Sequence, residues 1–251
     1  MNVFGHISRL LPEGRIKTSI RSVYNSLIIY KPISIKTETF KGIEIQMYQY
    51  PLLHYPIDIN VLKGYTKNKS ITKGMTVIDV GAFDGTFTIY AAKKVGDTGE
   101  VIAYEPDDFA YKMLLRNIEL NRLTNVAVIK RGIYNQVGNK LFINSFWDSR
   151  ISCDDTRALK YIEVSTLDQE LQRLILPRVD FVKMDIEGAE IEAIQTMKQL
   201  LKLKPYFAIA SYHFVDGKQT YKVLETFFKR RKYKVKTEYE DHLTTYAEAI
   251  K

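Results

Sequence analysis

The chain has 251 residues, a net charge of +8 and a hydrophobic content of 45%, which is ordinary for a globular protein with a substantial core. No apolar run approaches the roughly 18 residues that a spanning helix needs, so we expect no transmembrane segment. The N-terminus shows no secretion signal, and the single cysteine, Cys153, excludes an internal disulfide and a multi-cysteine zinc site. A cytoplasmic protein is the expectation from these features.

The first 70 residues predict a small N-terminal α/β extension. Residues 15–29 have the pattern of a short amphipathic helix that Pro32 would stop. Residues 33–50, with Gly42 near their middle, are typical of a β-hairpin. We therefore expect an extension over residues 1–70 and a main domain over residues 71–251.

From residue 75 onward, segments with strand and helix patterns alternate. Strands are expected at residues 76–80, 101–104, 126–129, 180–184, 207–210, 233–235 and 245–247. Helices are expected at residues 86–95, 107–121 and 219–229, and along an inner face formed by Ile191, Ile194, Met197 and Leu201. Strands separated by helices predict a mostly parallel sheet with helices on both faces, which is a doubly wound α/β domain.

The connection between the third and fourth predicted strands, residues 130–179, is unusually long for a crossover. Residues 141–143 and 162–164 have the pattern of extra strands. We expect an insertion at about residues 134–165 that faces the substrate. Its Trp147 and Tyr161 either stack on a ring of the substrate or attach the insertion to the sheet.

The stretch VIDVGAFDG, residues 77–85, combines two glycines with two carboxylates where the first predicted strand of the sheet leads into a helix. Open parallel sheets bind ligands beyond the C-terminal ends of their strands. Gly81 and Gly85 allow a tight turn and a close approach of the backbone to a ligand. Glu105 ends the next strand, where a carboxylate can accept both hydroxyl hydrogens of a ribose.

This turn lacks the G-x-G-x-x-G pattern that holds a pyrophosphate. It offers the carboxylates of Asp79 and Asp84 instead, which suit a cationic ligand. S-adenosyl-L-methionine carries a sulfonium and an ammonium group and no phosphate. The sequence therefore predicts S-adenosyl-L-methionine as the cofactor at this turn.

Four stretches of the chain together resemble the FkbM family of S-adenosylmethionine-dependent methyltransferases, from Thr76 to roughly His213. They are VIDVGAFDGTFTIYAA, VIAYEPDDFAYKMLLRNIELN, VSTLDQEL and VDFVKMDIEGAEIEAI. The most specific part is the K-x-D-x-E-G-x-E block at residues 183–190. The resemblance implies the class I methyltransferase fold, a Rossmann-like seven-stranded sheet whose last strand is antiparallel.

The resemblance also implies roles for individual residues. The residues around the first turn would surround the methionine part of the cofactor, Glu105 would hold the ribose, and Asp107 or Ile133 would flank the adenine. The predicted cofactor-binding residues are Asp79, Gly81, Ala82, Phe83, Asp84, Gly85, Glu105, Pro106, Asp107 and Ile133. Family members of known substrate mostly methylate hydroxyl oxygens of small molecules or sugars. One departure is Ser211, which stands where the family often has a glutamate two residues before the histidine.

Methyl transfer is an in-line displacement, and a hydroxyl acceptor needs a base or a metal ion to remove its proton. The fourth and fifth strands end at MDIEGAE and ASYHF, which makes Asp185, Glu187 and His213 the candidate catalytic residues. Each has a structural alternative: a helix cap for Asp185, a complement to the helix dipole for Glu187 and a packed loop histidine for His213. Two carboxylates are a thin basis for a metal site, and none is predicted.

Two further features of the sequence have a structural interpretation. Asn117 and Asn121 continue the apolar stripe of their helix, and we expect their amides to bond to neighbouring backbone. The remaining histidines are expected to lie away from the site: His6, His54 and His242.

Three functions remain open from the sequence. The leading one is O-methylation of a small molecule or glycan. The net charge and the basic stretch at residues 229–236 favour an RNA (tRNA) methyltransferase, although that stretch also fits a solvated helix end followed by a half-buried strand. Enzymes that methylate base amino groups commonly carry an N-P-P-Y-like motif after the fourth strand. This chain has DIEG there, which argues against methylation of a base amino group. The third is a non-catalytic module that binds the cofactor, and the oligomeric state is not indicated.

Overall fold

The computed structural model describes residues 32–50, 59–143, 150–151, 160–215 and 217–250. Within these ranges no helix combines the length and the hydrophobicity needed to cross a membrane. The expectations that lie outside the described residues are those for the helix at 15–29 and for His6, His54, Trp147 and Cys153.

A seven-stranded sheet in the order β14–β15–β11–β10–β3–β4–β5 forms the centre of the molecule. Its strands are β3 (Thr76–Val80), β4 (Glu100–Tyr104), β5 (Val126–Ile129), β10 (Phe181–Met184), β11 (Tyr206–Ala210), β14 (Tyr233–Tyr239) and β15 (Leu243–Ala249). Five of these strands pair in parallel from β11 to β5, whereas β15 is antiparallel to both β11 and β14. The predicted mostly parallel sheet with an antiparallel last strand is confirmed.

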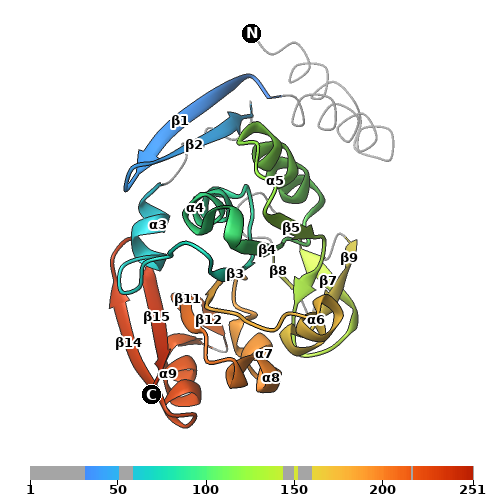
Figure 1. The fold of residues 1–251 in the computed structure, drawn as a ribbon. Coiled ribbons are helices and arrows are strands. Elements are labelled where there is room, and N and C mark those ends of the chain that lie inside the picture. Colours follow the sequence, from blue (N-terminus) through green and yellow to red (C-terminus); the bar gives the residue numbers. More distant parts are fainter. Residues whose placement is uncertain (1–31, 51–58, 144–149, 152–159, 216, 251) are drawn as a thin grey trace, which may run out of the picture.

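Helices cover both faces of this sheet (Figure 1). One face carries α3 (Ile59–Tyr65), α4 (Thr86–Val95) and α5 (Asp108–Leu120), and the other carries α6 (Leu167–Leu174), α7 (Glu190–Ile194), α8 (Lys198–Lys202) and α9 (Tyr221–Lys229). Alternate residues of β11 face opposite sides of the sheet. Ala208 packs in the core on the α4 side, whereas Phe207 and Ile209 pack in the core on the other side. Burial on both faces explains why the central strands are rich in apolar residues.

The predicted helix around Ile194 is divided into two short helices, α7 and α8. The Thr196 hydroxyl donates to the Ala193 carbonyl, at 3.2 Å, between them. The carboxylate of Asp168, at the start of α6, then accepts from the backbone N–H groups of Gln199 and Leu200 at the start of α8. This tertiary cap starts a new helix, which the local periodicity could not show.

The strands β1 (Ser34–Phe40) and β2 (Ile43–Gln49) form an antiparallel hairpin that packs outside α4 and α5. The amide of Asn121 accepts from the Gln46 N–H at 3.2 Å and donates to the Gln46 carbonyl at 2.6 Å. Asn117 accepts from the Tyr48 N–H and donates to the carbonyl of Asp84. The structural interpretation of these asparagines is therefore confirmed, and they hold the open edge of β2 against the sheet domain.

The described part of the predicted N-terminal extension shares a core with the sheet. Phe40, Ile45 and Met47 of the hairpin are buried in one cluster with Val77 and Ile89. The boundary near residue 70 stays a prediction.

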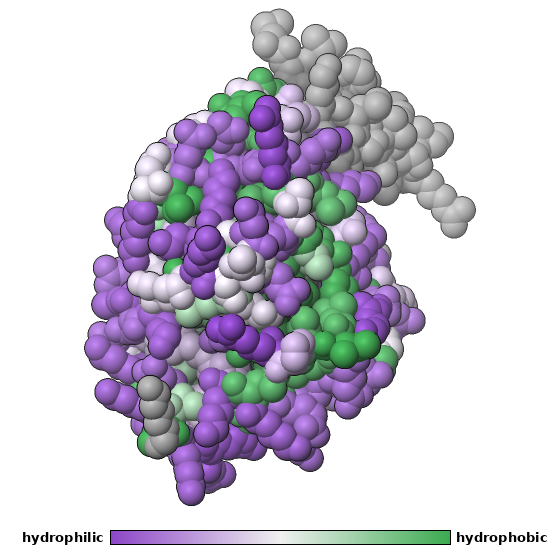
Figure 2. Space-filling view, viewed as in Figure 1, coloured by the Kyte–Doolittle hydropathy of each residue, from purple (hydrophilic) through white to green (hydrophobic). Residues whose placement is uncertain are grey.

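A second sheet of four strands, in the order β6–β9–β7–β8, follows β5. These strands are β6 (Gly132–Ile133), β7 (Gly138–Ile143), β8 (Arg150–Ile151) and β9 (Lys160–Ser165). Ile162 and Val164 of β9 pack against Ala189 in the loop after β10, so this sheet touches the candidate site. In Figure 2 a band of apolar residues lies on the right-hand side of the molecule, over the region of this sheet and α6. The remaining elements are η1 (Gly96–Thr98), β12 (Phe214–Val215) and β13 (Lys218–Gln219).

Candidate active site

The candidate site lies at the C-terminal edge of the parallel strands, around the point where the strand order reverses. The chain proceeds from β3 outward through β4 and β5 and then returns to form β10 on the other side of β3. Crevices at such reversals are where open α/β sheets bind ligands. Four loops meet there: residues 81–85, 105–107, 185–189 and 211–213.

Glu105 joins two of these loops. Its Oε2 accepts from the Phe83 N–H and its Oε1 accepts from the Asp107 N–H, both at 2.8 Å. The side chain is 6% exposed, and burial raises its pKa to about 7 although the two backbone amides oppose that rise. Each carboxylate oxygen has further acceptor capacity, so this group can still receive the hydroxyl hydrogens of a ribose.

The two glycines of the turn have positive φ angles, as expected for glycines in a tight turn. The groups that approach them closely are other residues of the chain and not a ligand. A Cβ on Gly81, at φ +76°, would lie 1.8 Å from the backbone oxygen of Asp185. A Cβ on Gly85, at φ +94°, would lie 2.7 Å from Leu114 of α5. Close packing between loops and helices therefore requires both glycines before any ligand is considered. Between them, Phe83 has a φ of 50° and an exposed ring.

Asp79 lies beneath the turn and not at its surface. It is 0% exposed, accepts from the Thr88 hydroxyl at 2.6 Å and lies 3.1 Å from the Lys183 ammonium. Lys183 also donates to the Gly81 carbonyl at 2.6 Å, so one buried lysine ties β10 to β3 and to the turn. Lys183 balances the charge of Asp79 inside the protein, so contact of Asp79 with a cationic ligand stays a prediction.

The other predicted cofactor-binding residues divide into two groups. Asp84 is half-buried at the turn, where its Oδ1 accepts from the backbone and hydroxyl of Thr86 and burial raises its pKa. Asp107 caps α5 by accepting from the backbone of residues 109 and 110, and half-buried Pro106 precedes it. Two positions face the core: Ala82 is buried, and Ile133 is 1% exposed. The Ile133 side chain belongs to the buried core cluster on the α6 side of the sheet, and its contact with adenine stays a prediction.

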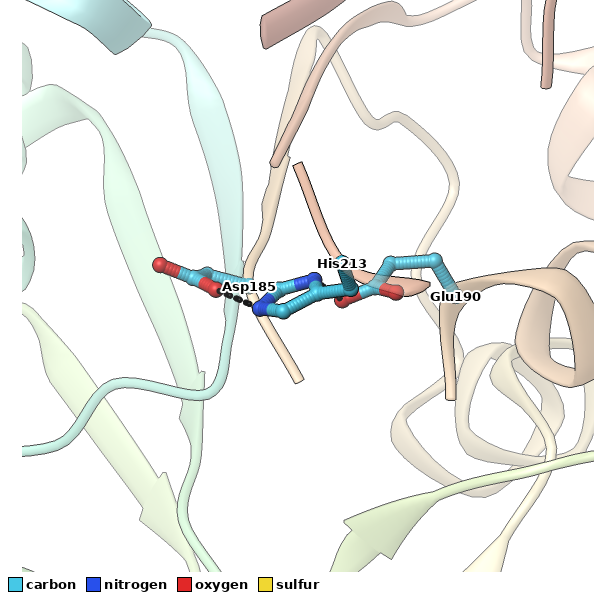
Figure 3. A group of neighbouring side chains, drawn as sticks. All are labelled: Asp185, Glu190 and His213. Carbon is cyan, nitrogen blue, oxygen red and sulfur yellow. Dashed lines mark ion pairs between the residues drawn. The ribbon is translucent and has the colours of Figure 1, made fainter. Parts of the chain in front are cut away.

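The loops after β10 and β11 bring the predicted catalytic residues together. His213 Nε2 lies 3.2 Å from Glu187 and 3.8 Å from Asp185, whereas His213 Nδ1 lies 3.1 Å from Glu190. Figure 3 shows the imidazole ring between the carboxylates of Asp185 and Glu190. Glu190 itself accepts from the backbone N–H of Ile186 and thus fixes the loop.

These contacts decide the protonation of His213. Burial by itself would lower its pKa, but the ion pairs with Glu187 and Glu190 outweigh burial and raise the pKa to about 10. His213 is therefore an imidazolium at neutral pH and holds no free lone pair. Among the predicted catalytic residues, we therefore expect Asp185, whose side chain is 21% exposed, to accept the proton.

Asp185, Glu190 and His213 each place one possible metal-ligating atom within 4.8 Å of the others. The two carboxylates face different nitrogens of the ring (Figure 3). One ion takes one nitrogen of an imidazole, so an ion held by these three residues would use either Nδ1 or Nε2 and not both. The raised pKa of His213 fits a protonated ring between the carboxylates.

Sequence reasoning missed three side chains around Asp185. The Tyr65 hydroxyl donates to Asp185 Oδ2 at 2.7 Å, and the Tyr212 hydroxyl lies 3.5 Å from Oδ1. The His242 ring lies tilted at 4.8 Å from the Tyr65 ring and edge-on at 5.6 Å from the Tyr212 ring, so the expectation that it lies away from the site is wrong. Tyr212 adjoins His213 in sequence, but no local signal marks Tyr65 or His242.

Comparison with known proteins identifies the family. The family model described as the methyltransferase FkbM domain matches residues 79–235, which is more than half of the chain. The chain belongs to the FkbM methyltransferase family. The methyltransferase sdnD of Sordaria araneosa is 26% identical over 47% of this chain and 59% of its own length.

Solved structures show the same fold. The methyltransferase FkbM of Methylobacillus flagellatus superposes with a TM-score of 0.56 at 19% identity and covers 77% of this chain and 48% of its own. The fibrillarin of Aeropyrum pernix, solved with S-adenosyl-L-methionine bound, gives a TM-score of 0.51 at 14% identity over 86% of this chain and 84% of its own. This chain thus spans less than two thirds of the sdnD and Methylobacillus proteins. The class I methyltransferase fold predicted from the sequence is confirmed.

Proposed function

We propose that this FkbM protein transfers a methyl group from S-adenosyl-L-methionine to a hydroxyl oxygen of a small molecule or glycan. The observation that carries the proposal is the contact between the turn after β3, where the cofactor would bind, and the loop after β10, which carries Asp185. The backbone of Asp185 packs directly against Gly81 of the turn, so a proton-accepting carboxylate stands beside the loop that would hold the methyl donor.

The cofactor part of the proposal is supported by Glu105 and by the charge of the site. Glu105 would receive the two ribose hydroxyls, and Asp84 supplies negative charge at the turn for the sulfonium and ammonium groups. Phe83, exposed between the two glycines, would offer an apolar surface to the cofactor. The roles proposed for Asp79 and Ile133 are indirect: Asp79 anchors Lys183 under the turn, and Ile133 supports the loop from the core.

The proposed reaction is a single displacement. The acceptor oxygen attacks the methyl carbon in line with the departing sulfur, the oxygen–carbon bond forms and the sulfur–carbon bond breaks. The hydroxyl proton passes to Asp185, and the products are a methyl ether and S-adenosylhomocysteine. Imidazolium His213 would hold Glu187 and Glu190 in place while this proton moves.

A small uncharged or cationic acceptor is favoured over RNA by the distribution of charge. Asp185, Glu187 and Glu190 face a single imidazolium, so the acceptor side of the site is net negative and would repel phosphates. The basic stretch at residues 229–236 lies where β14 begins. Since β14 runs parallel to β11, that point is at the opposite edge of the sheet from the site.

The test of this function is transfer of labelled methyl from S-adenosyl-L-methionine into a cell lysate that is then separated into RNA, protein, glycan and small-molecule fractions. We expect the label in the glycan or small-molecule fraction. Label in RNA would support the alternative of an RNA methyltransferase. Cofactor binding without any transfer would support the alternative of a non-catalytic module.

Glu105 gives the proposed cofactor site a characteristic pH dependence. Because its pKa is raised to about 7, folding favours the neutral carboxyl, whereas two ribose hydroxyl donors favour the carboxylate. Affinity for S-adenosylhomocysteine is therefore expected to fall about tenfold between pH 8 and pH 6. Calorimetric titration across this range measures it.

The Glu105→Gln variant is the control for that experiment. It should bind S-adenosylhomocysteine about 2 kcal/mol more weakly at pH 8, because a neutral amide accepts the ribose hydroxyls less strongly. Its affinity for S-adenosylhomocysteine should also be the same at pH 6 and pH 8. A wild-type affinity that does not change with pH would assign the ribose to another residue.

A further inference from the structure

Tyr65 reaches the candidate site from outside the region that the FkbM family model matches. It is the last residue of α3, whereas the matched region begins at residue 79. The phenol is 1% exposed, and its hydroxyl donates to Asp185 Oδ2 at 2.7 Å. A hydrogen bond to a carboxylate is of the strong, charge-assisted kind.

The ring of Tyr65 is fixed on several sides. Phe87 packs edge-on at 5.8 Å, His242 lies at 4.8 Å and the Lys183 ammonium lies 5.3 Å from the ring centre. Burial, together with neighbouring Asp185, raises the pKa of Tyr65 well above its usual value, so the phenol remains a donor throughout the physiological range. The donor is thus rigid and always protonated.

Tyr65 engages only one of the two oxygens of Asp185. The other, Oδ1, accepts only a long hydrogen bond from the Tyr212 hydroxyl, at 3.5 Å, and lies 3.8 Å from His213 Nε2. Oδ1 is therefore the less strongly engaged oxygen of the two and the more available one for an incoming hydroxyl. Fixing Oδ2 sets the rotation of the carboxylate and hence the direction of the Oδ1 lone pairs.

We propose that Tyr65 is a positioning residue for methyl transfer, which orients Asp185 so that Oδ1 faces the acceptor. The inference rests on the proposed function, in which Asp185 accepts the proton. It assigns part of the reacting centre to α3, so the segment before the matched domain contributes to turnover and not only to the core.

The test is a double-mutant cycle between Tyr65→Phe and Asp185→Asn, with turnover and cofactor affinity measured for each variant. Tyr65→Phe keeps the buried ring and is expected to lower kcat roughly 10- to 100-fold, with KM for S-adenosyl-L-methionine changed less than twofold. In the Asp185→Asn background the same change should alter kcat less than twofold, because the oriented group is already gone.

Tyr246→Phe is the matched control. Its hydroxyl is also buried and also bonds to α3, at the Gly64 carbonyl 2.5 Å away, but it does not touch Asp185. This variant should lose similar stability and retain kcat. An equal loss of kcat in Tyr246→Phe would mean that Tyr65 acts only through the fold, and that result would overturn the proposal.

The outcomes separate this inference from the proposed function. A wild-type chain without methyl transfer would refute the function. An active wild type with an inactive Asp185→Asn and a fully active Tyr65→Phe would refute only the role of Tyr65. Should Tyr65→Phe fail to fold, a crystal structure of the wild type with S-adenosylhomocysteine decides: a retained contact between the Tyr65 hydroxyl and Asp185 Oδ2 supports the role, and a broken contact overturns it.

Discussion

Replacing Asp185 with asparagine is expected to lower kcat for methyl transfer by roughly 10²- to 10⁴-fold. Asparagine has nearly the same shape and can still accept from Tyr65, but it cannot take the acceptor proton at neutral pH. Cofactor affinity should change little, because Glu105 and the turn at Gly81 hold the cofactor in our account. Steady-state kinetics and calorimetry with S-adenosylhomocysteine measure the two quantities separately.

Asp97→Asn is the matched control for this variant. Asp97 is exposed in η1, just before β4 begins and thus at the opposite edge of the sheet. Its replacement should leave both kcat and affinity unchanged. If Asp185→Asn instead weakened S-adenosylhomocysteine binding as much as it lowered kcat, Asp185 would be a cofactor ligand and not the proton acceptor.

Lys183→Met is expected to destabilise the fold by about 3–5 kcal/mol. The methionine side chain fills similar space, but it leaves Asp79 without a countercharge in a position that is 0% exposed. It also removes the hydrogen bond to the Gly81 carbonyl, so the turn should loosen. Urea unfolding of the variant and the wild type measures the difference.

The double variant Asp79→Asn/Lys183→Met tests the cause of that loss. Because the orphaned charge is then absent, stability should recover by a large part of the deficit. Lys198→Met, at an exposed position in α8, serves as the control and should be within about 0.5 kcal/mol of the wild type. A Lys183→Met protein as stable as that control would show that the buried pair is not what holds the turn.

The layered sheet could be predicted because its elements carry strong local periodicity. Residues 206–210 are continuously apolar, residues 76–80 are mostly β-branched, and residues 108–120 carry a clear apolar stripe. The division of the helix around Ile194 into α7 and α8 could not be predicted, because the cap that starts α8 is Asp168, from another part of the chain.

The position of the site also followed from a general rule, that strand ends of a parallel sheet gather at one edge. That rule placed Glu105, Asp185, Glu187 and His213 on neighbouring loops. It could not show how each side chain is used there. Asp79 is buried against Lys183, and His213 is held between two carboxylates. Local sequence could not show either contact, because each depends on side chains that only the fold brings together.

Tyr65 is the clearest case of what local pattern cannot supply. It lies 120 residues from Asp185 in sequence, in a short helix with no motif. His242 reaches the same place from the turn between β14 and β15. Contacts over such separations follow from topology, because β15 inserts beside β11 and carries its preceding turn to the edge where β10 ends.

Whether the turn after β3 binds S-adenosyl-L-methionine can be measured by calorimetric titration of the wild-type chain with S-adenosylhomocysteine, beside NAD as a comparison ligand. We expect saturable binding of one S-adenosylhomocysteine per chain and no measurable binding of NAD, because the turn after β3 offers the Asp84 carboxylate and no pyrophosphate loop. Absence of S-adenosylhomocysteine binding, or a preference for NAD, would contradict it.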